Sequence, residues 1–268
     1  MVYYKNFKKI IEGKILEIER KYDFTDKWYA IMFNPYFITR SALYKATMKF
    51  SSVLGLDKKI LDVGCGSKPY QHLFKNCEYF GIDIKEGNKS DQHKKTDLFF
   101  DGENIPLENN KFDAVVCTEV FEHVENINKL INEINRVLKK GGLIFYTMPF
   151  MWPEHCQPHD FRRYTSIEHK RMLEKNNFIN IKIKKTTGIF SSVGQLISDF
   201  FVNKSFNITL NTGSFSYKIE FILKRLIFIF VCFPTQAFFL FLNYIFKNKG
   251  ATLDYVVTAK KITKYKHI

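Results

Sequence analysis

The chain has 268 residues, of which 46% are hydrophobic and 25% charged, and its formal net charge is +14. A chain of this length and composition can bury a large core, so we expect one α/β domain with attached segments. The five cysteines have neither disulfide nor metal-ligand spacing. This argues against a disulfide-stapled secreted domain and favours a reducing, cytoplasmic compartment.

The positive charge points to an anionic partner, such as nucleic acid, an acidic membrane surface or a charged substrate. Lysines are spread through most segments, and a biased genome would produce the same excess. The sequence has no separate RNA-binding module and no basic-aromatic repeat, so nucleic acid is the least favoured of these partners.

Residues 1–50 have the pattern of amphipathic helices with aromatic faces, and we expect them to form a helical cap. The aromatic positions are Trp28, Tyr29, Phe33, Tyr36 and Phe37. The first residues show no long apolar core and no small-residue cleavage site, so the pattern predicts no secretory signal.

An apolar strand is predicted over residues 59–63, followed by a turn that contains Gly64 and Gly66. Glycine permits positive φ and lets a ligand approach bare backbone. A helix predicted over 68–76 would point unpaired N–H groups at a carboxylate or phosphate. The pattern predicts a cradle for a nucleoside cofactor.

A second strand, over 78–83, ends in Asp83, which lies 19 residues after Gly64. This is the expected position of a ribose-binding acid in a Rossmann-type unit. A dinucleotide-binding turn would usually carry a third glycine, but Ser67, Lys68 and Pro69 follow here. A nicotinamide-dependent oxidoreductase is therefore the less favoured alternative.

Strands continue to alternate with helices along the chain, which predicts a parallel, doubly wound sheet. The further predicted elements are strand 94–98, strand 112–118, helix 121–139, strand 142–148, helix 165–176 and strand 178–185.

Three motifs resemble one known family: Leu61-Asp62-Val63-Gly64-Cys65-Gly66, Phe112-Asp113-Ala114-Val115-Val116 and Glu119-Val120-Phe121-Glu122-His123-Val124. Over roughly residues 55–185 and the final strand, the chain is similar to class I S-adenosylmethionine-dependent methyltransferases. The resemblance implies a Rossmann-like fold with a mostly parallel seven-stranded sheet and helices on both faces. The family often has glycine where Lys68 stands, so the chain departs from the pattern there.

The resemblance also implies S-adenosylmethionine as cofactor. Asp97 matches the position that accepts a hydrogen bond from the adenine amino group, and Leu98 would pack on the ring; the alternative is a solvated aspartate at a strand end. The complete predicted cofactor set is Asp62, Gly64, Cys65, Gly66, Asp83, Ile84, Asp97, Leu98 and Thr118.

Glu119, Glu122 and His123 have i, i+3, i+4 spacing, so a helix beginning there would bring them to one face. Similar motifs occur in ubiquinone-pathway O-methyltransferases and small-RNA 3′-end methyltransferases, which are associated with magnesium-type ions. A fourth ligand would have to come from His155 or His159. The alternative, which we favour, is that Glu122 and His123 only cap and pack the helix start, with no metal.

Residues 149–165, here called the proline-rich loop, concentrate acidic, basic, cationic and aromatic groups at the carboxyl edge of the sheet. For methyl transfer to a hydroxyl, His155 or His159 would act as the base, and Asp160 or Glu119 would orient its ring. Arg162 or Arg163 would grip an acceptor carboxylate or phosphate. Trp152 would stack on a ring or sugar, and Tyr164 completes the predicted substrate set.

The alternative for this loop is that its prolines only stiffen a structural connection. Its Pro-Glu-His and Pro-His-Asp-Phe-Arg-Arg-Tyr-Thr pattern resembles a methyltransferase subgroup linked to surface-glycan and envelope biosynthesis. Thr118-Glu119-Val120-Phe121 lacks the Asn/Asp-Pro-Pro-aromatic motif typical of methylases that act on nucleobase amino groups.

Residues 226–246 contain no charge, and a helix of this length would span roughly 30 Å. A strand predicted over 253–259 must nevertheless return to the sheet, and a single crossing would leave it in the wrong compartment. Pro234 is predicted to divide the run into two short helices. We therefore expect 187–250 to be a helical insertion before the last strand.

The insertion would dip into one leaflet, with Lys224, Arg225, Lys247 and Lys249 at the headgroups, or pack internally or in a dimer; a true span is the third alternative. The remaining segments, 51–186 and 251–262, would form the catalytic domain.

The sequence as a whole predicts an O-methyltransferase with a small-molecule, sugar or lipid-linked acceptor, in the cytoplasm or peripheral on the cytoplasmic face of the membrane. A cofactor-binding interaction protein without catalysis is the alternative outside enzymology.

Overall fold

The computed structural model describes residues 24–85, 87, 94–206, 226–247 and 250–263. The chain divides into two compact units. The first, the helical unit, combines residues 1–45 with 187–252, and the second, the sheet unit, combines 46–186 with 253–268. The helical unit therefore contains most of the predicted N-terminal cap together with the predicted insertion, two segments that were predicted separately.

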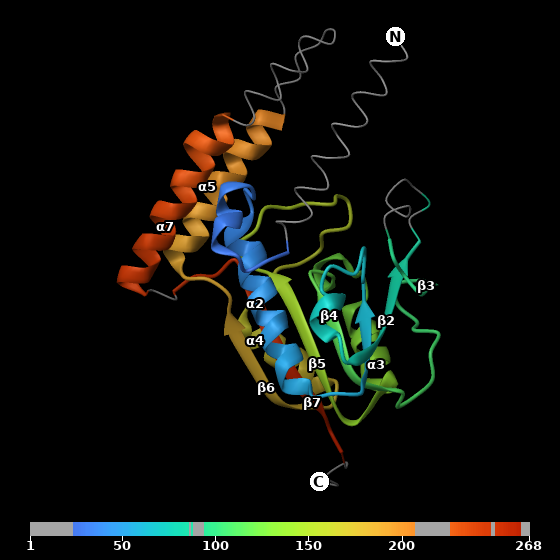
Figure 1. Ribbon diagram of the computed structural model, residues 1–268. Helices are drawn as coiled ribbons and strands as arrows, with labels where there is room; N and C mark the ends of the chain where they lie inside the picture. Colours follow the sequence, from blue (N-terminus) through green and yellow to red (C-terminus); the bar gives the residue numbers. More distant parts are fainter. Residues whose placement is uncertain (1–23, 86, 88–93, 207–225, 248–249, 264–268) are drawn as a thin grey trace, which may run out of the picture. The chain divides into compact units, whose positions relative to one another are not determined.

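In the described residues of the sheet unit, seven strands form one sheet in the order β3-β2-β1-β4-β5-β7-β6. The strands are β1 (Lys58–Val63), β2 (Cys77–Ile84), β3 (Leu98–Phe100), β4 (Phe112–Thr118), β5 (Leu138–Pro149), β6 (Phe178–Lys185) and β7 (Asp254–Lys261). The pairs from β3 to β5 are parallel, and β7 runs antiparallel to both β5 and β6. This confirms the predicted Rossmann-like, mostly parallel sheet (Figure 1).

Helical residues of the sheet unit cover both faces of its sheet. In the two units together, the described residues include the helical elements η1 (Trp28–Met32), α2 (Phe37–Leu54), η2 (Gln71–Phe74), η4 (Phe121–His123), α3 (Ile127–Val137), α4 (Ser166–Lys175), α5 (Ile189–Phe206), η5 (Phe228–Cys232) and α7 (Phe233–Phe246). On β5, Tyr146 faces the core shared with α3 and α4. Its neighbour Phe145 points to the other face and stacks on Phe50 of α2, with ring centroids 4.7 Å apart. This alternation along one strand follows from the two-residue period of a pleated strand.

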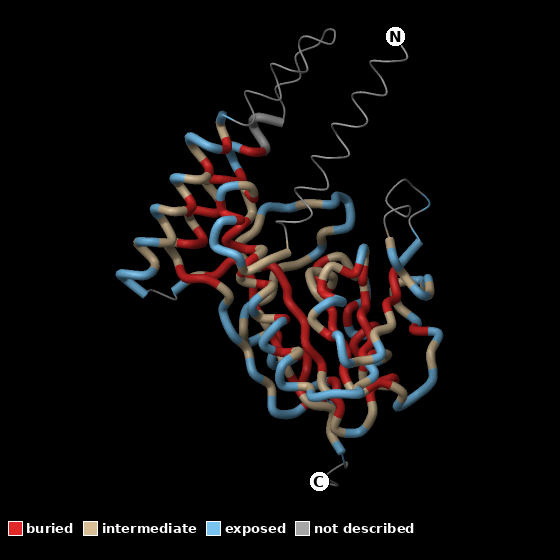
Figure 2. The backbone as a smooth tube through the Cα atoms, viewed as in Figure 1, coloured by how far each residue is buried: buried red, intermediate tan, exposed pale blue. Residues whose placement is uncertain are grey.

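The amphipathic helix α3 supplies five buried residues to the sheet core, namely Ile127, Leu130, Ile131, Ile134 and Val137. Asn126 caps it by accepting a hydrogen bond from the Lys129 N–H. Figure 2 shows the buried backbone concentrated in the central strands. The core therefore holds the strand ends in fixed positions, where the connecting loops begin.

Several local predictions were wrong. The helix predicted over 68–76 is only the short 3-10 turn η2, and it cannot begin at Lys68, whose φ of 55° is not helical. The strand predicted over 94–98 lies further along the chain, as β3 at Leu98–Phe100. The helix predicted over 121–139 is η4 followed by α3, since the cap at Asn126 starts a new helix. Strand β5 begins at Leu138, earlier than the predicted strand 142–148.

The helical unit packs its N-terminal segment against the insertion. Ala30, Ile31 and Phe37 form a buried cluster that contacts Phe233 and Leu240 of α7. The side-chain amide of Gln195 in α5 donates to the Pro35 carbonyl over 2.8 Å. A Cβ atom on Gly194 would lie 2.5 Å from the Cβ of Phe239, so glycine is needed for the close approach of α5 and α7.

The apolar run does not break at Pro234, so the prediction of two helices meeting at a break was wrong. A π-helical turn, η5, runs directly into α7, and Pro234 lies in the first turn of α7, where its missing N–H is tolerated. Among the described residues, the combined helix Phe228–Phe246 is the one long and apolar enough to cross a membrane, and 17% of its apolar window is buried. Lys224, Arg225 and Lys249 lie outside the described residues.

Candidate active site

The predicted functional residues gather at the carboxyl edge of the sheet unit. Strands β1, β2, β4 and β5 run parallel and end at Val63, Ile84, Thr118 and Pro149. Ligands of open α/β sheets bind outside these strand ends. Most of the predicted cofactor, catalytic and substrate residues lie in these four strands or in the connections that follow them. The exceptions are Asp97 and Leu98, which lie directly before and at the start of β3.

The glycine turn after β1 has the geometry of a cradle. Gly64 has φ 72°, and a Cβ atom there would lie 2.4 Å from Cγ2 of Val120. Gly66 has φ 49°, and no atom lies within 4 Å of the position that its Cβ would take. Its N–H donates to Oδ2 of Asp83 over 2.7 Å. The turn is thus tied to β2 and still leaves room above bare backbone, which fits the nucleoside cofactor implied by the sequence.

Asp83, the predicted ribose acid, is buried and fixed by several donors. Its Oδ1 accepts from the Ile84 N–H over 2.7 Å and lies 3.2 Å from Nζ of Lys94. The side chain of Ile84 is exposed at the rim of the site. Lys94 was not predicted as a partner of Asp83, because the spacing of the two residues in the sequence matches no known pattern of contact.

Asp97, the predicted adenine acid, is paired with Lys68. Its Oδ2 accepts from the Gly81 N–H over 2.7 Å and from Nζ of Lys68. Lys68 has φ 55°, in the left-handed region that glycine occupies without strain. The backbone of Lys68 thus has a conformation that suits glycine, while its side chain reaches Asp97. This explains how lysine can stand where the family often has glycine.

The inward path of Lys68 depends on a further glycine. A Cβ atom on Gly81 would lie 2.4 Å from Cε of Lys68 and 2.7 Å from Sγ of Cys65. The lysine ammonium also lies 6.0 Å from the centre of the Tyr79 ring. Lys68 therefore belongs to the same edge as Asp97, a position that its sequence context did not predict.

Asp62 and Cys65 lie beneath the turn. The Tyr79 hydroxyl donates to Oδ2 of Asp62 over 2.5 Å. Burial raises the pKa of Asp62 to about 7, although the Tyr79 hydrogen bond acts in the opposite direction. Burial likewise raises the pKa of the Cys65 thiol to about 12, so it stays protonated. These contacts give both residues a structural role, while Leu98 packs against the core and Thr118 closes β4.

The proline-rich loop is fastened to the segment after β4. The Phe161 N–H donates to the Glu122 carbonyl over 2.8 Å. Arg162 donates to the carbonyl oxygens of Phe121, Val124 and Glu125. This use of the guanidinium favours a role in holding the loop over the predicted grip on an acceptor.

Arg163 is used in a similar way. It makes a bidentate pair with Asp160, with N–O distances of 2.5 and 2.7 Å, and donates to the carbonyl oxygens of Trp152 and Pro153. The Arg163 hydrogen bonds lower the pKa of Asp160 to about 2, so this carboxylate stays ionised. Tyr164 packs edge-on against His169 with centroids 5.8 Å apart. Trp152, like the rest of the predicted substrate set, is half-buried.

The two candidate bases differ in their surroundings. The His155 N–H donates to Oδ2 of Asp160 over 2.9 Å, and the His155 ring nitrogen Nδ1 lies 3.3 Å from the same oxygen. His159 is exposed, and its ring packs edge-on against Phe161. Of the two rings, that of His155 lies beside a carboxylate, an arrangement that can orient a general base.

Glu119, Glu122 and His123 do not share a helix face. Only residues 121–123 are helical, as a 3-10 turn, and Glu119 precedes them with φ 54°. Glu122 is fully buried, neither of its carboxylate oxygens has a hydrogen-bond partner, and burial together with repulsion from Glu119 raises its pKa well above the usual range. Among the described residues, the group whose ligand atoms lie within 4.8 Å of one another is His123, His155 and Cys156, not the predicted trio.

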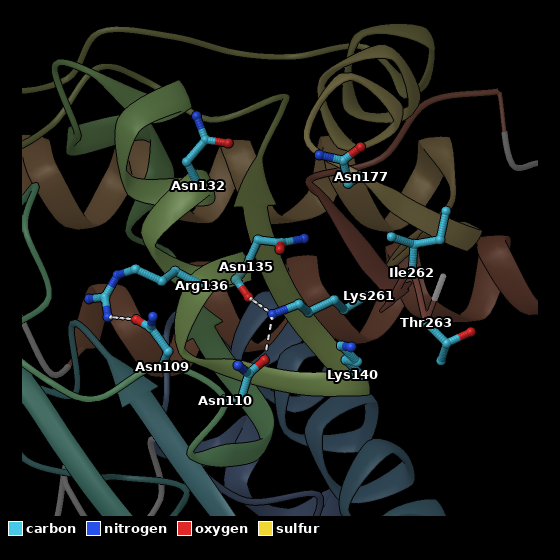
Figure 3. A pocket seen from close by; sticks show the side chains of 10 residues that line it. All are labelled: Asn109, Asn110, Asn132, Asn135, Arg136, Lys140, Asn177, Lys261, Ile262 and Thr263. Carbon is cyan, nitrogen blue, oxygen red and sulfur yellow. Dashed lines mark hydrogen bonds between the residues drawn. The ribbon is translucent and has the colours of Figure 1, made fainter. Parts of the chain in front are cut away.

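A cavity of about 680 Å³ lies at the opposite edge of the sheet (Figure 3). It contains two cations that are already used: Nζ of Lys261 donates to Asn110 and to the carbonyl oxygens of Asn135 and Leu138, and Arg136 pairs with Glu133. These cations hold the loops together, so we place the active site at the carboxyl edge.

A model of the methyltransferase domain family matches residues 61–146. The chain is 34% identical over 132 residues to an uncharacterised protein of Methanocaldococcus jannaschii, which is 46% of this chain and 58% of that protein. It is 33% identical over 103 residues to a ubiquinone biosynthesis O-methyltransferase of Dechloromonas aromatica, which is 33% of this chain and 43% of that enzyme.

A third relative is the tRNA (carboxymethyluridine(34)-5-O)-methyltransferase of Schizosaccharomyces pombe, 26% identical over 141 residues, which is 51% of this chain and 60% of that enzyme. The chain spans about half the length of these curated relatives. The family match and the named relatives support an S-adenosylmethionine-dependent methyltransferase domain in this chain.

Two solved structures agree with the fold. The [4+2]-cyclase SpnF has a TM-score of 0.53 at 16% identity, over 84% of this chain and 83% of its own. A Haemonchus contortus phosphoethanolamine N-methyltransferase, solved with S-adenosylhomocysteine, has a TM-score of 0.52 at 16% identity, over 88% of this chain and 56% of its own. At this identity the likeness shows the Rossmann-like class I methyltransferase fold alone.

Proposed function

We propose that this chain is an S-adenosylmethionine-dependent O-methyltransferase that acts on a hydroxyl of a small-molecule, sugar or lipid-linked acceptor. The observation that carries the proposal is the His155–Asp160 pair, which stands in the loop after β5 at the same sheet edge as the glycine turn. The methyltransferase domain match over residues 61–146 supports the donor.

When bound, S-adenosylmethionine supplies an electrophilic methyl group. Gly66 offers open backbone to the cofactor, and Asp83 and Asp97 are the acids that the family resemblance assigns to the ribose and to the adenine. His155 would accept the proton from the acceptor hydroxyl as the new bond forms. Asp160 lies 3.3 Å from Nδ1 of His155, where its negative charge would orient the ring and stabilise the imidazolium that results.

Hydroxyl methylation fits these residues because an alcohol must lose a proton during transfer, whereas many amines are nucleophilic without a positioned base. The names of two relatives also support oxygen as the methylated atom, since the ubiquinone biosynthesis enzyme and the tRNA enzyme are both O-methyltransferases. Trp152 offers a ring for stacking against a sugar or an aromatic acceptor. A role in envelope glycan synthesis rests on the resemblance of the proline-rich loop alone.

The first experiment is calorimetry with S-adenosylmethionine and with NAD. We expect binding of the first and none of the second; the reverse would favour the oxidoreductase alternative. Labelled S-adenosylmethionine incubated with fractionated cell extract, followed by mass spectrometry, should then yield a product with a methyl ether. Cofactor binding without a labelled product from any fraction would favour the non-catalytic alternative.

We also propose that the helical unit contacts the cytoplasmic face of a membrane. Aromatic side chains on its long helix are exposed, including Phe230 at 72% and Tyr244 at 76%. Phe238, Phe241 and Phe246 are exposed as well. An apolar helix with little of its surface buried is what an interfacial helix presents to lipid, and the net charge of +14 favours anionic headgroups.

Flotation with anionic phosphatidylserine vesicles tests this surface. We expect the wild type to float with the vesicles and a Phe230→Ser/Phe238→Ser/Phe241→Ser variant to stay behind. Ile167→Ser, at an exposed position of α4 in the sheet unit, is the matched control and should float. Full recovery of the wild type in the soluble fraction at low and high salt, without detergent, would reject membrane contact.

A further inference from the structure

Two histidines and a cysteine meet where η4 touches the proline-rich loop. His123 comes from η4, and His155 and Cys156 come from the loop; one ligand atom of each lies within 4.8 Å of those of the other two. The two imidazole rings stand edge to face, with centroids 4.9 Å apart and planes at 81°. Imidazole and thiolate are the ligands that zinc-type ions prefer.

The hydrogen bond of His123 fixes which of its nitrogens is available. Nδ1 lies 2.6 Å from the carbonyl oxygen of His159, and because a carbonyl only accepts, Nδ1 carries the proton. The lone pair is therefore on Nε2. A histidine that binds a metal through one ring nitrogen usually donates the N–H of its other ring nitrogen to an oxygen acceptor, as His123 does here.

A separate observation concerns the surroundings of Nε2. This nitrogen lies 3.5 Å from Oε1 of Glu122. Glu122 is fully buried and neither of its oxygens has a hydrogen-bond partner. Adjacent nitrogen and oxygen ligands of a tetrahedral zinc ion lie roughly 3.4 Å apart. A divalent cation bound here would contact both groups and displace the proton of Glu122, and its charge would balance one thiolate and one carboxylate.

We propose that His123, His155 and Cys156 form a binding site for a thiophilic divalent cation such as Zn²⁺, with the buried carboxylate of Glu122 next to His123. Each histidine has an oxygen beside its Nδ1: the His159 carbonyl for His123, and the Pro153 carbonyl and Asp160, both at 3.3 Å, for His155. The site differs from the predicted magnesium trio, because a sulfur ligand disfavours a hard ion and Glu119 takes no part.

Cobalt spectroscopy of the full-length, metal-stripped protein tests the site without any assay of activity. We expect one equivalent of Co²⁺ to give a thiolate-to-cobalt charge-transfer band, which equimolar Zn²⁺ removes and a large excess of Mg²⁺ does not. Cys156→Ser should lose the band and bind Zn²⁺ more than about 10-fold more weakly. Cys77→Ser is the matched control and should keep the band, because Cys77 starts β2, whereas the candidate site lies at the end where β2 finishes.

Thermal unfolding followed by circular dichroism checks that both variants fold. A band that survives in Cys156→Ser, the absence of any band in the wild type, or displacement by Mg²⁺ would each overturn the site. His155→Ala provides a second route to the same answer: it should weaken Zn²⁺ binding while keeping the thiolate, so an unchanged affinity also argues against the proposal.

One consequence for turnover rests on the proposed function. A metal-bound His155 has no lone pair left to accept the proton of the acceptor hydroxyl. Stoichiometric Zn²⁺ should therefore lower the methylation rate of the wild type. In Cys156→Ser, which should bind Zn²⁺ weakly, the ratio of rates with and without Zn²⁺ should move towards one. Methylation without cobalt binding would reject the metal site alone. Cobalt binding without methylation of any extract fraction would reject the proposed function alone.

Discussion

The two halves of the candidate site treat their charged groups differently. At the cofactor edge, each acid has a fixed partner: Asp62 has Tyr79, Asp83 has the Gly66 N–H, and Asp97 has Lys68. Beside the proline-rich loop, in contrast, the carboxylate of Glu122 is buried with no hydrogen-bond partner. A cradle that is fully paired suits a ligand that never changes, whereas unsatisfied groups are tolerated where a proton or an ion is handled.

The largest expected effect tests the base on the loop side. His155→Ala should lower kcat by about 10²–10⁴-fold, because a general base contributes a factor of that size. His159→Ala is the matched control: its ring is exposed, and the contact it makes with His123 is through the main chain. Cofactor binding, measured by calorimetry, should be unchanged in both. Equal rates in the two variants would remove His155 from its role.

A second test addresses the cofactor edge. Gly64→Ala should lower the free energy of unfolding by about 3 kcal/mol, because the new Cβ is strained at φ 72° and overlaps Val120. Gly66→Ala should lower it by only about 1 kcal/mol, since its Cβ meets no atom, yet the methyl group would enter the open cradle and weaken S-adenosylmethionine binding. Urea unfolding and calorimetry measure the two effects separately.

If Gly66→Ala binds the cofactor as well as the wild type does, the open space above that turn is not the cofactor cradle. The pair is informative because both glycines have positive φ, and only the surroundings of their Cβ positions differ.

Ionisation of Asp62 should change the free energy of unfolding by roughly a few kcal/mol at most. Its folded pKa of about 7 is above the unfolded value, so ionisation opposes folding, and stability should fall as the pH rises from about 4 to 7. Asp62→Asn keeps an oxygen acceptor for Tyr79 and removes the titration. The wild type should therefore lose stability relative to the variant over this range in urea unfolding; parallel curves would contradict the assignment.

Asp160 should show the opposite sign with a smaller amplitude. Its folded pKa of about 2 is below the unfolded value, so it stabilises the fold above pH 4, and this stability is lost as the pH falls towards 2. The difference in unfolding free energy between the wild type and Asp160→Asn should be constant from pH 5 to 7 and shrink below pH 4. A difference that does not change with pH would mean that the Arg163 pair contributes through shape alone.

The sheet was largely predictable, because its signal is local. The predicted strand 178–185 has the same bounds as β6, and the strand ends at Val63 and Thr118 follow directly from apolar runs. The glycine turn and Asp83 were predictable for the same reason: their spacing reports a backbone geometry that recurs whenever a parallel strand pair holds a nucleoside.

The ion pairs were not predictable. Lys68 pairs with Asp97, 29 residues away, and Lys94 pairs with Asp83 and also donates to the Ile84 carbonyl. A lysine has the same appearance in a sequence whether it is solvated or buried against a carboxylate. The roles of Arg162 and Arg163 were hidden in the same way, since their acceptors are main-chain carbonyl oxygens and Asp160.

The position of β7 has a consequence for synthesis of the chain. Strand β7 lies between β5 and β6 and supplies a ladder to each, although it is translated after both of them and after the whole helical insertion. Until β7 leaves the ribosome, β5 and β6 each present an open strand edge, while the apolar α7 has already emerged. The nascent chain therefore passes through a stage with two unpaired strand edges and an apolar helix, a combination that favours aggregation until β7 is inserted.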